Sequence, residues 1–139
     1  MAYKPGSVAI VGAAETTELG KLPDISQLQL HADAALNAMA DCGLRPADID
    51  GVATAREVPT ELAHYLGIVP KWVDGTSVGG CSFMIHVRHA CAAIEAGLCN
   101  TVLITHGESG RSPIGRPAQA AGPSPQEGTS RMPTGPLGP

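Results

Sequence analysis

Short apolar runs and helical apolar periods alternate along residues 1–108. Apolar runs bounded by Gly, Pro or Asp predict four strands, at 7–12, 51–54, 72–77 and 101–106. Between them, apolar residues recur every three or four positions, which predicts helices over about 26–42, 60–66 and 80–97. Strands that alternate with helices favour an α/β fold, with a mostly parallel sheet flanked by helices and joined by right-handed crossovers.

The ends of the first helix carry clear local signals. Ser26 and Gln29 form a capping box at its start, and Gly43 follows its last turn. The run that precedes this helix, Ser7–Gly12, is almost entirely apolar, so we expect a fully buried strand there. The residues after it lack the GxGxxG spacing of a dinucleotide fingerprint, and we therefore expect no Rossmann cofactor site.

Composition narrows the class of protein. Hydrophobic residues make up 43% of the chain and aromatic residues only 3%, which favours close-packed helices on a sheet over an aromatic-filled β-sandwich. The formal net charge is −4 and Lys and Arg form no run, so nucleic acid and anionic membranes are poor partners. The four cysteines include no CxxC pair, and the sequence shows no secretory leader and no apolar run of membrane length. We expect a cytoplasmic protein with reduced thiols.

The stretch Thr76–Met84 carries the strongest candidate chemistry. Gly79 and Gly80 lack a Cβ and permit a sharp turn into the third helix. Cys81 and Ser82 then fall in its first turn, where unpaired amides and the helix dipole favour negative charge, so a thiol there should ionise more readily. We assign Cys81 as the candidate catalytic residue, and Gly80 and Ser82 as candidate substrate-binding residues. A buried, unreactive cysteine beneath a tight turn is the alternative.

The same helix offers other possible ligands. Its apolar positions predict a buried seam formed by Met84, Val87, Cys91 and Ile94. That seam places His86 and His89 on another side of the helix. Their spacing matches no zinc pattern, so we expect no metal site.

A third group of candidates follows the last predicted strand. His106, Gly107 and Glu108 lie at its carboxyl end, where α/β proteins gather functional groups. We therefore expect His106 and Glu108 to bind substrate. The alternative is an ordinary strand exit with a glycine turn and a solvated glutamate. His31 and His64, on predicted helices, are expected to be surface or hydrogen-bonded histidines.

The character of the sequence changes after Glu108. Residues 109–139 are rich in Pro and Gly and poor in large apolar side chains, so alone they cannot bury enough surface to offset the entropy of ordering. We expect two regions: an incomplete α/β domain over 1–108, and over 109–139 either a disordered tail or the opening of a further Gly/Pro-rich region whose packing partners are missing. The end of the chain inside a Gly-Pro loop indicates truncation.

Six short segments follow one another along the chain in a fixed order. They are V-A-I-V-G at 8–12, D-I-D-G-V at 48–52, G-G-C-S at 79–82, A-I-E-A-G at 93–97, V-L-I at 102–104 and G-E-S at 107–109, and the Ala/Leu-rich first helix lies between the first two. Together they resemble the N-terminal half of a thiolase, and most of all the lipid-transfer, sterol-carrier-type acetyl-CoA acetyltransferase branch. The resemblance covers nearly the whole chain. It is specific in the order and spacing of the segments more than in any one motif.

The resemblance implies a thiolase fold of two similar βαβαβ halves, of which this chain would carry most of one, in a homodimer or larger homo-oligomer. It implies reversible Claisen condensation or thiolysis of acyl-CoA, in which a cysteine at a helix start is acylated and groups from the C-terminal half act as bases. A CoA thioester would be the substrate, and no further cofactor is implied. We therefore expect an N-terminal fragment of an acyl-CoA acyltransferase that is inactive alone.

One departure from the family pattern leaves other functions open. Counting back from 93–97 without gaps places the family's nucleophile at Gly80, with Cys81 one residue late. Either a one-residue shift restores Cys81 to that position, or the protein lacks the acyl-accepting thiol. A thiolase-like protein without the acyl-accepting thiol resembles the lyases that cleave CoA-thioester side chains by a retro-aldol reaction, together with a zinc-ribbon/OB-fold partner. A non-catalytic scaffold subunit is the remaining alternative.

Overall fold

The computed structural model describes residues 5–109 of the chain. Three helices, one short 3-10 turn and three strands alternate along these residues. In chain order they are α1 (Gln27–Cys42), η1 (Pro46–Asp48), β1 (Gly51–Ala55), α2 (Pro59–Leu66), β2 (Trp72–Asp74), α3 (Ser82–Glu95) and β3 (Val102–His106). The predicted C-terminal region 109–139 lies outside the described residues, apart from Ser109.

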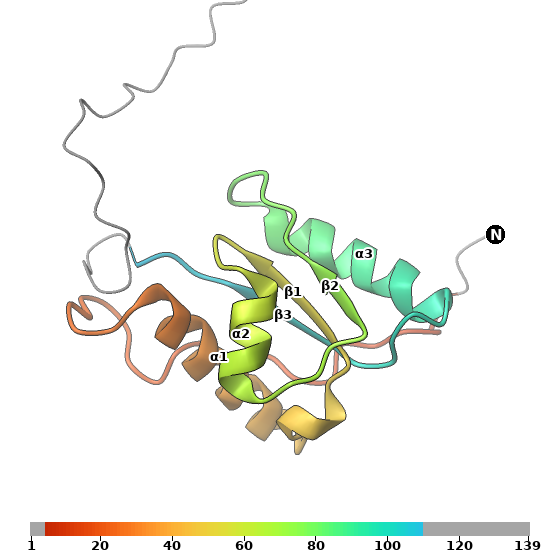
Figure 1. The fold of residues 1–139 in the computed structure, drawn as a ribbon, viewed down its shortest axis with the longest axis horizontal. Coiled ribbons are helices and arrows are strands. Elements are labelled where there is room, and N and C mark those ends of the chain that lie inside the picture. Colours follow the sequence, from red (N-terminus) through yellow and green to blue (C-terminus); the bar gives the residue numbers. More distant parts are fainter. Residues whose placement is uncertain (1–4, 110–139) are drawn as a thin grey trace, which may run out of the picture.

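The strands form one parallel sheet with β1 at its centre, in the order β2–β1–β3. Gly51 of β1 lies opposite Trp72 of β2 and Val102 of β3, so the three strands start together. Helices α1 and α2 cover one face of the sheet and α3 covers the other (Figure 1). The predicted α/β fold is therefore confirmed, although β2 is shorter than the predicted strand 72–77.

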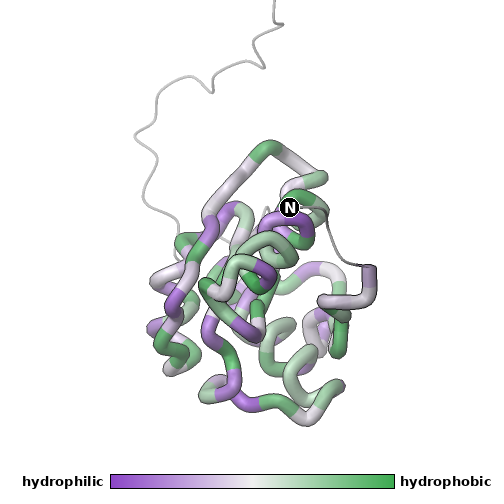
Figure 2. The backbone as a smooth tube through the Cα atoms, turned by 90° about the vertical axis from the view of Figure 1, so that its right-hand side faces the viewer, coloured by the Kyte–Doolittle hydropathy of each residue, from purple (hydrophilic) through white to green (hydrophobic). Residues whose placement is uncertain are grey.

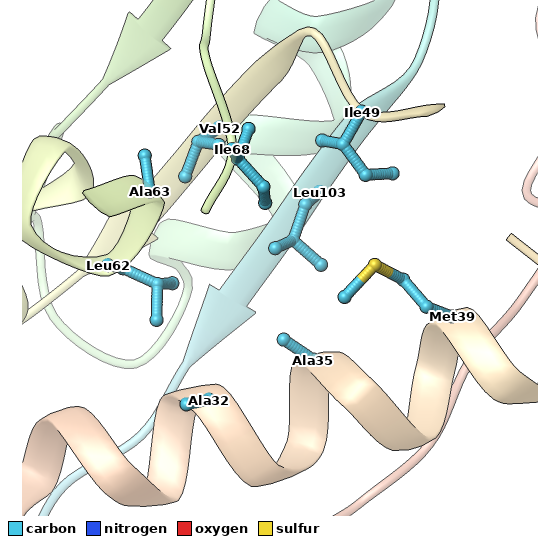
Figure 3. Close-up of a cluster of buried hydrophobic side chains, with 9 residues drawn as sticks. All are labelled: Ala32, Ala35, Met39, Ile49, Val52, Leu62, Ala63, Ile68 and Leu103. Carbon is cyan, nitrogen blue, oxygen red and sulfur yellow. The ribbon is translucent and has the colours of Figure 1, made fainter. Parts of the chain in front are cut away.

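The main hydrophobic core lies between the sheet and the layer of α1 and α2 (Figure 3). Ala32, Ala35 and Met39 recur on α1 at helical spacing and face the sheet, where Leu103 of β3 meets them. The other buried members of this cluster are Ile49, Val52, Leu62, Ala63 and Ile68. Full burial of one large aliphatic side chain contributes about 1.5–3 kcal/mol, so this layer fixes α1 and α2 on the sheet.

Helix α1 begins and ends where the sequence predicts. The Ser26 hydroxyl accepts the Gln29 N–H at 3.2 Å, and the Gln29 side chain accepts the Ser26 N–H at 2.8 Å. This reciprocal pair is the predicted capping box. Gly43 then ends the helix with a φ of 72°, in the left-handed region that glycine enters without strain.

Helix α3 packs on the opposite face of the sheet through small residues. Strand alternation turns Gly51, Ala53 and Ala55 of β1 toward it. A Cβ added to Gly51 would lie only 2.8 Å from Val102 Cγ2, which shows how little space is left here. The buried residues of α3 are Ser82, His86, Ala90 and Ala93.

The predicted apolar seam is therefore not the most buried face of α3, although Val87, Cys91 and Ile94 are half-buried. Met84, one of its members, is 60% exposed, whereas His86 lies on the buried face and not on another side of the helix. Small side chains allow a helix to approach the sheet closely, and a period of large apolar residues does not detect that preference.

The N-terminal segment 7–12 is not the buried strand that the sequence predicts. Ile10 and Val11 are 79% and 64% exposed, and among residues 5–109 the segment pairs with no strand. Hydrogen bonds to the helices hold its two ends instead: Ser7 Oγ donates to Glu95 Oε1 of α3 at 2.6 Å, and directly after the segment the Ala13 N–H donates to Asp41 Oδ2 of α1 at 3.1 Å. Without a neighbouring strand, its apolar side chains have no face on which to be buried.

At the edge of the sheet where the strands begin, the Asp50 side chain contacts the turns that precede β2 and β3. Its carboxylate accepts the N–H groups of Asn100 and Thr101 at 2.8 and 2.9 Å, and the Lys71 ammonium lies 3.3 Å away. Burial alone would raise the pKa of Asp50, but the hydrogen bonds from Thr101, Asn100 and Lys71 lower it to about 2. The ionised carboxylate therefore fixes the turns that lead into β2 and β3.

Apolar residues are not confined to the core, and they also occur in segments on the outside of the molecule (Figure 2). Leu19 and Val69, for example, are 70% and 86% exposed. None of the helices within residues 5–109 is long and apolar enough to cross a membrane. The exposed apolar side chains that matter most are those at the start of α3, because they adjoin the candidate site.

Candidate functional site

The three parallel strands end at one edge of the sheet, the usual place for binding groups in open α/β folds. Arg56 follows β1, the loop from Asp74 to the glycine turn follows β2, and His106 ends β3. The start of α3 and the exit of β3, which the sequence analysis selected separately, therefore meet at the same edge.

The two glycines before α3 play different roles. Gly79 has a φ of +94°, in the left-handed region that side chains rarely adopt. Gly80 has no such φ, and a Cβ built on it would meet no described atom within 4 Å. Contrary to the prediction, only Gly79 is needed for the turn. Position 80 faces open space.

The buried side chain of Ser82 stabilises this turn by hydrogen bonds to its backbone. Its hydroxyl donates to the Gly79 carbonyl at 2.7 Å and accepts the Val78 N–H at 2.9 Å. The side chain is fully buried. In this arrangement Ser82, predicted to bind substrate, shapes the turn that presents its neighbours.

Cys81 occupies the N-cap position of α3. Of the four cysteines it is the one that is exposed, and its side chain makes no capping hydrogen bond. Its carbonyl accepts the Met84 N–H at 3.1 Å, so the helix begins directly after it. The thiol thus stands at the positive end of the helix dipole. Cys99, by contrast, is buried, and burial raises the pKa of its thiol.

Asp74 holds the loop that leads from β2 to the glycine turn. Its carboxylate accepts the Thr76 N–H at 2.8 Å and the Thr76 hydroxyl at 2.6 Å, and Nδ1 of His89 on α3 lies 2.5 Å away. Burial alone would raise the pKa of Asp74, but the hydrogen bonds from Thr76 and His89 lower it. His89 therefore anchors the loop to α3.

His106 meets Phe83 where the exit of β3 approaches the start of α3. The ring centroids are 5.9 Å apart and the planes are inclined at 37°. Thr105 faces α1, so strand alternation turns His106 to the opposite face. Because Phe83 follows Cys81 by two residues, this contact places His106 beside the start of α3. His106 therefore lies beside the helical turn that begins at Cys81.

Apolar side chains are exposed on both sides of the glycine turn. Val78 is 54% exposed, and Phe83 and Met84 are 41% and 60% exposed. Apolar surface beside a few polar groups is typical of sites that bind organic ligands.

His31 of α1 holds the exit of β3 from the other face of the sheet. Its Nδ1 lies 2.7 Å from Thr105 Oγ1, and its Nε2 lies 3.2 Å from the Gly107 carbonyl oxygen. A carbonyl can only accept, so Nε2 carries the proton and Nδ1 accepts the Thr105 hydroxyl. Burial lowers the pKa of His31 more than the hydrogen bond to Gly107 raises it. The sequence predicts that His31 is a surface or hydrogen-bonded histidine, and the second possibility is right. The sequence did not indicate that His31 contacts the exit of β3.

Arg56 is a second residue of this edge that the sequence analysis missed. It has a φ of 74°, unusual for a residue other than glycine, and the Gln27 side chain donates to its carbonyl. Its Nε lies 3.0 Å from Glu108 Oε1, so an ion pair joins the exits of β1 and β3. Both side chains are about half exposed, and the pair adds little to stability. No motif marks Arg56, although its position directly after a buried strand indicates the edge of the sheet.

A cavity of about 610 Å³ opens beside the exit of β3, lined by residues of 14–22, of α1 and of 106–109. Its lining includes His106 but neither Gly80 nor Cys81. Glu15, Glu18 and Glu108 contribute carboxylates, which repel the phosphate groups of CoA. The cavity is therefore a poor place for the phosphate-bearing end of CoA.

His86 is the main unsatisfied polar group of α3. It is fully buried, and neither ring nitrogen has a hydrogen-bond partner within residues 5–109. A buried polar group without partners costs about 1–3 kcal/mol. No three His, Cys, Asp or Glu side chains in the same range are grouped so that they could hold a metal ion.

No protein-family profile matches the sequence. Among curated proteins, a steroid side-chain-cleaving aldolase of Thermomonospora curvata is 33% identical over 118 residues, which cover 82% of this chain and 30% of the aldolase. A 17-hydroxy-3-oxo-4-pregnene-20-carboxyl-CoA lyase of Mycobacterium tuberculosis is 35% identical over 102 residues, which cover 70% of this chain and 26% of the lyase. The chain thus spans less than a third of the length of these relatives.

Solved structures share the fold. An Ltp2-ChsH2(DUF35) aldolase is 32% identical with a TM-score of 0.68, over 81% of this chain and 30% of that chain. A monomeric SCP2-thiolase-like protein from Mycobacterium smegmatis is 30% identical with a TM-score of 0.61, over 71% of this chain and 23% of that chain. OleA of Xanthomonas campestris, at 17% identity and a TM-score of 0.56 over 62% of this chain and 28% of that chain, supports the fold alone. The central parallel sheet, the helices on both of its faces and these similarities together establish that the chain has a thiolase-like fold.

Proposed function

We propose that this chain is part of a thiolase-like lyase that cleaves the acyl side chain of a CoA thioester. The observation that carries the proposal is its identity of 33% and 35% with a steroid side-chain-cleaving aldolase and a pregnene-carboxyl-CoA lyase. The resemblance to acetyl-CoA acetyltransferases led us to expect acyl transfer, with the lyase as the alternative. These relatives favour the lyase.

The proposed reaction is the retro-aldol cleavage of a β-hydroxyacyl-CoA. A base takes the proton of the β-hydroxyl group, the carbon that bears it becomes a ketone, and the bond between the α and β carbons breaks. The electron pair of that bond moves onto the thioester as an enolate, which is then protonated to give a shorter CoA thioester. The reaction therefore needs a base near the hydroxyl group and hydrogen-bond donors near the thioester oxygen.

The carboxyl edge of the sheet offers groups of both kinds. The start of α3, at Gly80 and Cys81, presents the positive end of a helix dipole, which favours the developing enolate. Open space at Gly80 leaves room for the thioester. His106 is the proposed proton-transfer group, because its exposed ring lies against Phe83 at the same helix start. No acyl-enzyme forms in this reaction, so Cys81 is not needed as a nucleophile.

The same relatives support a proposal for the substrate class and the partner. Exposed Val78, Phe83 and Met84 fit a substrate whose acyl group carries an apolar ring system, such as a steroid. The similar aldolase structure is named for Ltp2 together with ChsH2(DUF35). We therefore propose that the protein that contains this chain acts with a DUF35-type zinc-ribbon/OB-fold partner and as an oligomer. No cofactor beyond the CoA thioester is proposed.

The test is to incubate the gene product that contains this chain with 17-hydroxy-3-oxo-4-pregnene-20-carboxyl-CoA, with and without a DUF35-type protein. Mass spectrometry is expected to show a steroid ketone and a shorter CoA thioester, with heat-denatured protein as the control. A parallel reaction with acetoacetyl-CoA and CoA measures thiolysis. Thiolysis without steroid cleavage would contradict the proposal and favour the acyltransferase.

A further inference from the structure

We propose that His31 is a positioning residue, which aims His106 at the start of α3. The inference rests on the proposed function, in which His106 exchanges a proton with the substrate. His31 itself lies on α1, on the far side of the sheet from α3, and is only 2% exposed. It therefore acts through the backbone of β3 and does not touch the substrate.

The contacts of His31 fall on both sides of His106. Nδ1 accepts the hydroxyl of Thr105, and Nε2 donates to the carbonyl of Gly107. These two residues are the immediate neighbours of His106 in the chain. Alternation along an extended backbone turns Thr105 and His106 to opposite faces. Fixing the neighbours on the α1 face thus fixes the direction of His106 on the α3 face.

The packing at this point leaves little freedom. A Cβ added to Gly107 would lie 3.4 Å from both Cδ2 and Nε2 of His31, so the imidazole packs directly on the glycine backbone. Thr105 is 7% exposed, and within residues 5–109 the His31 ring is the hydrogen-bond partner of its hydroxyl. If the ring were lost, a buried hydroxyl and a part-buried carbonyl would need new partners, and the strand exit would have to shift to supply them.

The protonation state suits this role. Burial lowers the pKa of His31, and its hydrogen bond to Gly107 requires a proton on Nε2. Glu57 and His106 act on it electrostatically with opposite effects. The neutral ring with Nε2 protonated satisfies both hydrogen bonds at once, so the exit of β3 keeps one geometry near neutral pH.

The experiment compares His31→Leu, His31→Gln and Thr105→Val in the 139-residue chain by NMR, with His64→Leu as the control at an exposed histidine of α2. The reporter is the nuclear Overhauser effect between the rings of His106 and Phe83. We expect His31→Leu to abolish it and Thr105→Val to weaken it. His31→Gln, whose amide can donate to one partner and accept from the other, should restore it, and His64→Leu should leave it unchanged.

This spectroscopic reading does not depend on activity, so it separates failure of the inference from failure of the proposed function. If the wild-type gene product cleaves the steroid thioester, His31→Leu should lower kcat at least about tenfold with little change in KM, and His31→Gln should recover most of the loss. An unchanged ring contact in a folded His31→Leu chain would overturn the proposal. If His31→Leu does not fold, an unchanged contact in Thr105→Val would overturn it equally.

Discussion

Gly79 and Gly80 are neighbours in the turn before α3, but the backbone places different demands on them. Only Gly79 has a φ in the left-handed region, where a Cβ is strained. We predict that Gly79→Ala lowers the free energy of unfolding by about 1–2 kcal/mol, whereas Gly80→Ala changes it by less than about 0.5 kcal/mol. Urea unfolding of the two variants measures the difference. Equal losses in both would contradict the turn described for these residues.

His86 is buried on α3 without hydrogen bonds, so replacing it by an apolar side chain of similar size should stabilise the chain. We predict that His86→Leu raises the free energy of unfolding by about 1 kcal/mol at pH 8, because two unsatisfied ring nitrogens are removed. The matched control is His89→Leu on the same helix, which breaks the contact with Asp74 and should destabilise. Destabilisation by His86→Leu would show that its ring has a partner in solution.

His31 gives the stability of the chain a pH dependence of known sign. Burial lowers the pKa of this histidine below its ordinary 6.5, so in acid the unfolded chain takes up a proton that the folded chain resists. The contribution of His31 to stability is therefore complete above about pH 6.5 and is lost as the pH falls toward the lowered pKa. Glu57 limits the size of the effect, because its carboxylate favours the charged ring.

Thermal unfolding of wild type and His31→Gln between pH 7.5 and 5 checks this prediction, with His64→Leu as the control. The wild type should lose more stability than His31→Gln over this range. A difference between the two proteins that does not change with pH would mean that His31 titrates normally in the folded chain.

At the scale of elements, Asp50 is the residue that joins the turns before β2 and β3. Its pKa of about 2, against an ordinary value of 3.8, means that its contribution is present above about pH 4 and is lost as the pH falls through 2. We predict that Asp50→Asn costs about 1–2 kcal/mol at pH 7, after allowance for solvent screening. The gap between wild type and variant should narrow below pH 4. A gap that stays constant from pH 7 to pH 2 would contradict the role of the charge.

The sequence predicts an element well when its ends carry their own signals. The Ser26 capping box and Gly43 mark α1, and Gly67 marks the end of α2 with a φ of 70°. The segment 7–12 shows what such signals omit. Its apolar run has the composition of a strand, but a strand needs a neighbour with which to pair, and composition does not say whether one is present.

The same limit applies to the site. Cys81 and His106 could be selected from the sequence because a helix start and a strand end are local features. Arg56 and His31 could not, since their contacts with Glu108 and Gly107 join residues far apart in the chain. The buried face of α3 was misplaced for a related reason. Close packing on the sheet buries the small residues of the helix, whereas the apolar pattern along the helix marks its large residues.

In the whole molecule, the candidate site lies where two differently packed faces of the sheet end. The α1–α2 face has an aliphatic core and holds the exit of β3 through His31. The α3 face is packed with small residues and presents Cys81 and Phe83 at its open end. The chain covers 30% and 26% of its two curated relatives. The proposed lyase activity therefore belongs to the whole protein, in which this edge of the sheet would form one side of the active site.

Lyase and acyltransferase make opposite demands on Cys81, because only acyl transfer needs a thiol that becomes acylated. The most direct measurement is therefore the rate of steroid side-chain cleavage by the wild-type gene product and by Cys81→Ala, with thiolysis of acetoacetyl-CoA followed in parallel. We predict that wild type cleaves the steroid thioester and that Cys81→Ala retains this activity within about threefold. A loss of about a thousandfold or more in the folded variant, or thiolysis as the only wild-type activity, would contradict it.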